Sequence, residues 1–170
     1  LRLNHERLSM CCSRWPTHTP SVRILWEQLV QPVVLNKTGV DLLHAMAFVG
    51  PLASTCPFVV TIYDLSFLRF PEAFRPWNRW YLSRFTTLSA RRARRVIAIS
   101  QSTKRDVVQR LGVPADRVDV VYCGADDSFG LLPADEVASF RRQRGLPDRF
   151  ILFVGTLEPR KNIPTLLTAY

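Results

Sequence analysis

The 170-residue chain has the length of about one domain, and its 47% hydrophobic and 22% charged residues exclude an intrinsically disordered chain. Its 7 Gly and 12 Pro follow no period, which excludes a collagen-like sequence. There are 23 basic and 14 acidic residues, so the net charge is +9. This charge is compatible with nucleic acid, a membrane surface or a phosphorylated ligand, and does not choose among them.

The two ends of the sequence have the features of a fragment. The chain begins at Leu1 without a charged-then-apolar signal segment, and it stops at Tyr170 inside an amphipathic run. We therefore expect a piece of a longer protein, and some site residues to lie outside it.

The four cysteines form no spaced metal-binding set, and only three histidines accompany them. We expect no metal and reduced thiols, as in a cytoplasmic protein. Residues 42–63 contain no charged side chain, as a membrane span would, but Gly50, Pro51 and Pro57 interrupt them. Two buried strands around a loop are the favoured interpretation of this segment.

Helices and strands alternate through the first 122 residues. A helix is expected from Ser21, with Val22, Leu25, Trp26, Leu29 and Val33 at helical spacing, a kink at Pro32 and an end at Gly39. Strands are predicted over 40–44 and 58–62, followed by a loop over 64–75. Pro76 begins the next helix, with Trp77, Tyr81, Phe85 and Leu88 on one side and four arginines at its end.

A third strand is predicted over 96–99 and a fourth over 118–122. Between them lies a helix capped by Ser100, Ser102 or Thr103, with Asp106 placed to complete a capping box with Thr103, and an end at Gly112. The strands are nearly continuous apolar runs, which is typical of parallel strands covered on both faces. The fold class predicted is α/β: a Rossmann-like parallel sheet flanked by helices.

The last forty residues are expected to begin a second domain. A helix over 135–144, a strand over 150–154 and a helix from Ile163 are predicted there. The domain boundaries expected are 1–128 for a Rossmann-like domain, 129–148 for a connector and helix, and 149–170 for the start of another Rossmann-like domain.

Residues that follow the strands are the candidate site residues, because parallel α/β sheets bind ligands beyond the carboxyl ends of their strands. They are His44, Tyr63, Asp64, Ser100, Ser102, Gly124 and Asp126, then Gly155, Arg160 and Lys161. The last three combine a glycine, two cations and a helix start, a combination that is as compatible with phosphate binding as with an exposed basic loop. Tyr63 and Asp64 are the catalytic candidates, and Asp64 is placed to act as a base or to bind a hydroxyl. Cys123 as a nucleophile is disfavoured against a buried, inert thiol.

Three segments carry a family resemblance over roughly residues 21–170. FILFVGTLEPRKNIPTLLTAY (150–170) resembles the start of the carboxyl-terminal domain of family 4 retaining glycosyltransferases, which have two Rossmann-like domains (GT-B). RVIAISQSTKRDVVQRLGVPADRVDVVYCGAD (95–126) resembles the end of their amino-terminal domain, and DLLHA with PFVVTIYDLSFLRFPEAF resembles its middle strands.

This resemblance implies transfer of a sugar, mannose among the options, from a nucleotide-sugar to a glycan or lipid-linked acceptor hydroxyl with retention. It implies no metal or other cofactor, since the nucleotide-sugar is a co-substrate. Lys161 matches the family lysine that holds the donor diphosphate, Arg160 lies beside it, and Gly155 matches the close-approach glycine. Many members have His at Tyr63, Arg at Thr156 and Asn at Cys123. A two-glutamate motif is expected after Tyr170, so the chain alone is expected to be inactive.

Two other classes remain as alternatives: a nucleotide-sugar epimerase or hydrolase of the same fold, and a basic nucleic-acid-binding module. The second is disfavoured because the basic residues are spread along the chain, so we expect no nucleic-acid partner. We expect a cytoplasmic protein. Peripheral contact with the inner face of an anionic membrane, through Trp77, Arg79 and Trp80, is a further option.

Overall fold

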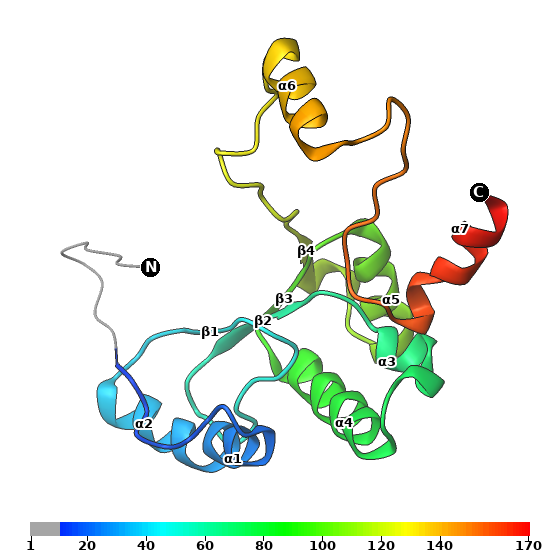
Figure 1. Ribbon diagram of the computed structural model, residues 1–170. Helices are drawn as coiled ribbons and strands as arrows, with labels where there is room; N and C mark the ends of the chain where they lie inside the picture. The colour runs from blue at the N-terminus through cyan, green and yellow to red at the C-terminus, as the bar shows by residue number, and fades with distance from the viewer. Residues whose placement is uncertain (1–10) are drawn as a thin grey trace. The chain divides into compact units, whose positions relative to one another are not determined.

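The computed structural model describes residues 11–170, and the chain divides into two compact units, Leu1–Tyr122 and Cys123–Tyr170 (Figure 1). The first domain expected from the sequence begins with residues 1–10, which lie outside the described residues. The boundary at residue 128 that the sequence suggested stays a prediction.

A four-stranded parallel sheet forms the centre of the first unit. Its strands are β1 (Leu43–Ala45), β2 (Phe58–Ile62), β3 (Arg95–Ala98) and β4 (Val118–Val120), and they lie side by side in chain order. The register pairs Ala45 with Val60, Val60 with Val96, and Val96 with Val118. The predicted parallel α/β fold is therefore confirmed.

One face of this sheet forms the hydrophobic core. Val60, Ile62, Val96 and Ala98 are completely buried there, in one cluster with residues of α4 (Pro76–Arg92) and α5 (Gln101–Leu111). The opposite face is less covered within the described residues. Its apolar positions are half-buried, and it carries an exposed ion pair in which Arg95 Nε donates to Asp119 Oδ2 over 2.7 Å. The expectation that the strands are covered on both faces is met fully on one face only, because the described helices supply core residues to that face.

The first helix runs from Pro20 to Thr38 in three segments: α1 (Pro20–Leu25), η1 (Trp26–Val30) and α2 (Gln31–Thr38). The middle segment is π-helical, with the Gln31 N–H donating to the Trp26 carbonyl. Pro32 has no N–H and its ring crowds the preceding turn, so a widened turn just before it relieves both effects. Gly39 ends the helix at φ 64°. Pro32 and Leu35 are its buried residues, whereas Leu25, Leu29 and Val33 are exposed.

Between β2 and β3, the expected loop contains two short helices, α3 (Ser66–Arg69) and the 3₁₀ turn η2 (Pro71–Ala73). In α4 the buried residues are Tyr81, Thr86, Ser89 and Ala90. Trp77, expected on the same side of the helix as Tyr81, is exposed. The arginines at its end have structural roles. Arg91 donates to the Leu111 carbonyl and Arg92 to the Ser54 carbonyl.

The helix between β3 and β4 has the predicted end. The helix α5 ends at Gly112, which has φ 67°, and the short turn η3 (Ala115–Arg117) leads into β4. Positive φ is easily adopted only by glycine, which explains why the helix stops there.

The second unit contains α6 (Ala134–Arg144), the turn η4 (Pro159–Lys161) and α7 (Ile163–Ala169). Both helices were predicted. Residues 150–154, expected as a strand, form no strand in the structure, and none of the described strands pairs with them. A strand requires ladder hydrogen bonds to a neighbour, so the apolar pattern alone does not produce one.

Candidate functional site

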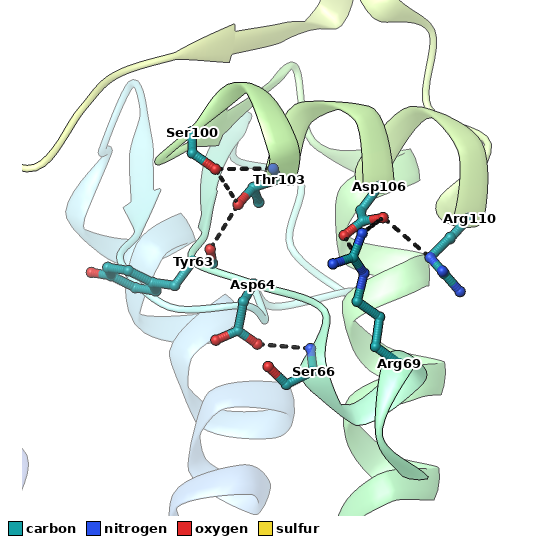
Figure 2. Close-up of polar contacts among 8 residues, drawn as sticks. All are labelled: Tyr63, Asp64, Ser66, Arg69, Ser100, Thr103, Asp106 and Arg110. Atoms are coloured by element: carbon teal, nitrogen blue, oxygen red, sulfur yellow. Dashed lines mark hydrogen bonds and ion pairs between the residues drawn. The ribbon is translucent and has the colours of Figure 1, made fainter. Parts of the chain in front are cut away.

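The carboxyl ends of β2 and β3 bring three of the candidate residues of the first unit together. Tyr63 and Asp64 come directly after β2, and Ser100 begins α5 just after β3 (Figure 2). Because the strands are parallel, these ends share one edge of the sheet. The structure therefore groups Tyr63, Asp64 and Ser100, as the sequence suggested.

Ser100 is the N-cap of α5 and is joined to the β2 loop through Thr103. The Thr103 N–H donates to Ser100 Oγ over 3.0 Å, and Thr103 Oγ1 donates to the Tyr63 carbonyl over 2.9 Å (Figure 2). The Ser100 and Thr103 hydroxyls are 2.9 Å apart. This chain of contacts fixes the position of Tyr63 relative to α5.

Asp64 orders the turn that leads into α3. Its Oδ1 accepts the Ser66 N–H over 2.8 Å, while the residue is exposed. Among the described residues, its Oδ2 has no hydrogen-bond partner. One carboxylate oxygen is thus used by the fold, and the other is open to a ligand hydroxyl.

Tyr63 is 38% exposed, and its ring packs against that of Phe48, with ring centroids 5.9 Å apart. Phe48 lies in the loop after β1, has φ 58°, and donates its N–H to the Thr61 carbonyl. Positive φ is unusual for a bulky residue, and such residues gather at functional sites. Sequence reasoning missed Phe48, because it lies within the uncharged run 42–63 and carries no local signal.

Two other candidates are placed differently from the expectation. His44 lies inside β1 rather than after it, and its Nε2 is 2.8 Å from Thr61 Oγ1. Ser102 lies in the first turn of α5 and is exposed. Neither side chain has a described contact with Tyr63, Asp64 or Ser100.

Asp106 does not complete the predicted capping box with Thr103. Its carboxylate instead lies between two arginines (Figure 2). Arg69 Nε is 3.0 Å from Oδ2, and Arg110 Nε is 3.2 Å from Oδ1. Through this nearly buried carboxylate, α5 is bonded to Arg69 in the segment after β2. The contact stabilises the two segments that carry Asp64 and Ser100.

The remaining candidates belong to the second unit. Gly124 is exposed, and Asp126 Oδ1 accepts the Ser128 N–H over 2.9 Å. Hydrogen bonds from the Ser128 side chain and backbone lower the pKa of Asp126. A Cβ at Gly155 would lie 3.0 Å from the Phe153 ring, so the glycine leaves room for that ring.

The basic turn η4 contains one paired and one exposed cation. Arg160 Nε donates to Glu158 Oε2 over 2.6 Å, and Glu158 Oε1 accepts from Thr156 Oγ1, also over 2.6 Å. The hydrogen bonds from Thr156 and then Arg160 lower the pKa of Glu158. Lys161 is exposed, and its side chain forms no hydrogen bond or ion pair among the described residues. Lys161 is therefore the cation of this turn that is open to an anion.

The described residues contain neither a metal-binding cluster nor a membrane-spanning helix. Between residues 11 and 170, no three His, Cys, Asp or Glu side chains lie close enough together to hold a metal ion. Over the same range, no helix combines the length and the apolar character that crossing a membrane requires.

The family model of Glycosyltransferase Family 4 matches residues 10–129, most of the chain. Together with the parallel Rossmann-like sheet, this match shows that the chain belongs to glycosyltransferase family 4. The resemblance noted in the sequence is thereby confirmed, with the α/β fold typical of the GT-B class.

Relatives with curated names include Escherichia coli proteins. The serotype-specific mannosyltransferase WbdA is 36% identical over 81 residues, which cover 46% of this chain and 10% of WbdA. The O-antigen chain mannosyltransferase B is 28% identical over 114 residues, covering 66% of this chain and 30% of that protein. An uncharacterized glycosyltransferase of Methanocaldococcus jannaschii, MJ1607, is 37% identical over 86 residues, covering 48% of this chain and 22% of the relative. The chain thus matches less than a third of the length of each relative.

Proposed function

We propose that this chain is the acceptor-side part of a mannosyltransferase that acts with retention. The family match over residues 10–129 carries this proposal, and the names of WbdA and mannosyltransferase B support the choice of mannose. The acceptor is a hydroxyl of a glycan or of a lipid-linked glycan. The nucleotide-sugar is on the cytoplasmic side, and the enzyme works there.

The acceptor sugar binds at the ends of β2 and β3 in this proposal. Asp64 Oδ2 accepts a hydrogen bond from a sugar hydroxyl, because the other oxygen is held by Ser66. The Tyr63 hydroxyl donates to the sugar, and its exposed ring borders the same space. Tyr63 stands where many family members have His, and a tyrosine is a poor base near neutral pH, so its role is positioning.

The donor diphosphate binds near Gly155, Arg160 and Lys161. A cation there stabilises the negative charge that develops on the departing nucleoside diphosphate. Lys161 provides this charge directly, and Arg160 orders the turn through Glu158. Neither a metal ion nor another cofactor takes part. We expect no transfer by these 170 residues alone, because they do not contain the two-glutamate motif that the family resemblance implies.

A mannosyl-transfer assay tests this proposal. The chain is joined after Tyr170 to the nucleotide-sugar-binding part of mannosyltransferase B, and transfer from GDP-mannose to a mannose oligosaccharide is followed. We expect an α-linked product from the joined protein and none from the chain alone. Lys161→Ala lowers kcat/KM by about a hundredfold, the range for one charge-stabilising group. The control Lys37→Ala, in α2, leaves it unchanged.

Transfer by the chain alone would contradict the proposal that it is only the acceptor-side part of the enzyme. Full activity in Lys161→Ala would contradict the role of the basic turn. A folded joined protein that transfers nothing from any nucleotide-sugar would contradict the proposed function.

A further inference from the structure

Two tryptophans at the start of α4 are exposed although they are large and apolar. Trp77 is 66% exposed and Trp80 is 53% exposed. Their rings stack on each other, with centroids 5.0 Å apart and an angle of 23° between the planes. Contiguous exposed apolar side chains mark interaction sites in soluble proteins, and tryptophan is enriched at such sites.

Three exposed arginines lie in the same part of the chain as this pair. Arg75 precedes the helix, and Arg79 and Arg84 lie on it; all three are exposed. Within the described residues, their side chains form no hydrogen bond or ion pair. The sequence of α4, PWNRWYLSRFTTLSARR, contains no acidic residue. We call Arg75, Trp77, Arg79, Trp80 and Arg84 the α4 surface.

A groove runs beside the α4 surface, with a volume of about 830 Å³. Phe74 and Trp80 give it apolar walls, Arg79 and Arg84 line it with positive charge, and Glu72 is its one acidic lining residue. Apolar side chains next to guanidinium groups are complementary to the glycerol and phosphate region of a lipid layer. There, tryptophan rings prefer the interface and arginines reach phosphates.

We propose that the α4 surface docks on an anionic phospholipid bilayer, with Trp77 and Trp80 at the interface and Arg75, Arg79 and Arg84 on lipid phosphates. This inference goes beyond the transfer reaction, since none of these residues lies at the strand ends. Charge complementarity selects an anionic rather than a neutral lipid layer. The apolar pair favours a lipid layer over duplex nucleic acid, whose binding is mainly phosphate neutralisation.

Vesicle flotation tests the proposal on the full chain. We expect it to float with vesicles that contain about 30% phosphatidylglycerol, and to stay behind with pure phosphatidylcholine. The charge reversal R79E with R84E weakens binding about tenfold or more, since each basic residue near the surface contributes several-fold. The matched control R142E with R144E, on α6, makes the same charge change and weakens binding less than about twofold.

The tryptophans are tested separately. Trp77→Ala with Trp80→Ala weakens binding by about fivefold and reduces fluorescence quenching by brominated lipids. The control Trp15→Ala removes another exposed tryptophan and leaves binding unchanged. Circular dichroism checks folding, and R79Q with R84Q replaces the charge reversal if that variant loses helix.

Equal losses from the two charge reversals would overturn the proposal, because binding would then follow net charge alone. Binding to neutral vesicles as strong as to anionic ones, or no flotation, would also overturn it. Tighter binding to a DNA duplex than to vesicles would assign the surface to nucleic acid instead.

Discussion

At the residue scale, the Asp106 carboxylate supports the site most directly. Only 10% of its side chain is exposed, and it binds both Arg69 and Arg110. In Asp106→Asn the charge is lost while the shape is kept. We expect the free energy of unfolding to fall by about 2 kcal/mol, the range for hydrogen bonds to a charged group.

Urea denaturation measures this change, with Asp41→Asn as control because Asp41 is exposed and has no described partner. The control should change the free energy of unfolding by less than about 0.5 kcal/mol. Equal effects of the two substitutions would show that the arginine pairing contributes nothing.

Tyr81 links stability to alkaline pH. Burial, and then the nearby Glu27 carboxylate, raise the pKa of Tyr81 from 10.0 to about 12. Between these two values the unfolded chain holds fewer protons than the folded one, so the free energy of unfolding falls as pH rises. In Tyr81→Phe the free energy of unfolding should fall less between pH 10 and 12, as urea denaturation at a series of pH values will show.

The control Tyr122→Phe changes an exposed tyrosine and should keep the full pH dependence. If the free energy of unfolding of Tyr81→Phe depended on pH as that of the unchanged chain does, the assignment to Tyr81 would be refuted.

The residue-level contacts of the site show what a single sequence leaves open. Asp106 follows Thr103 by three positions, and that spacing predicts a capping box. Arg69 is 37 positions away in the sequence, so nothing local announces that it takes the carboxylate instead. For the same reason Phe48 was missed, because only the folded loop brings it to Tyr63.

At the element scale, the start of α5 is capped by Ser100 and not by the neighbouring Ser102. Ser100→Ala removes the acceptor of the Thr103 N–H and should lower the free energy of unfolding by about 1 kcal/mol. Ser102→Ala, in the same first turn, should change it by less than about 0.5 kcal/mol. Thermal denaturation compares the two, and a larger loss in Ser102→Ala would disprove the capping assignment.

Element positions were predictable where the signal is local. The apolar runs gave β2 and β3 to within one residue, and Gly39 and Gly112 gave two helix ends. The direction in which a helix faces was less predictable. Tyr81 and Trp77 share one side by spacing, yet one is buried and the other exposed, because the core covers only part of α4.

At the scale of the whole molecule, pairing decides which apolar runs become strands. Residues 58–62 and 150–154 have similar patterns, but only the first has neighbouring strands to complete its hydrogen bonds. The parallel sheet was predictable because strands and helices alternate. The sequence also indicated that Gly155, Arg160 and Lys161 belong to a second unit. Their proposed role in binding the donor diphosphate rests on the family resemblance, which a local pattern of residues does not supply.

Titration of the ¹⁵N-labelled chain with α-mannobiose, followed by amide NMR, tests the central claim most directly. If the acceptor sugar binds at the carboxyl ends of the strands, signals of residues 46–50, 63–66 and 99–103 will shift together, with the sugar in the millimolar range. Signals near Pro57, Arg94 and Arg117, at the amino ends of β2, β3 and β4, will stay unchanged. Shifts confined to the amino ends, or no shifts at saturating sugar, would contradict the account.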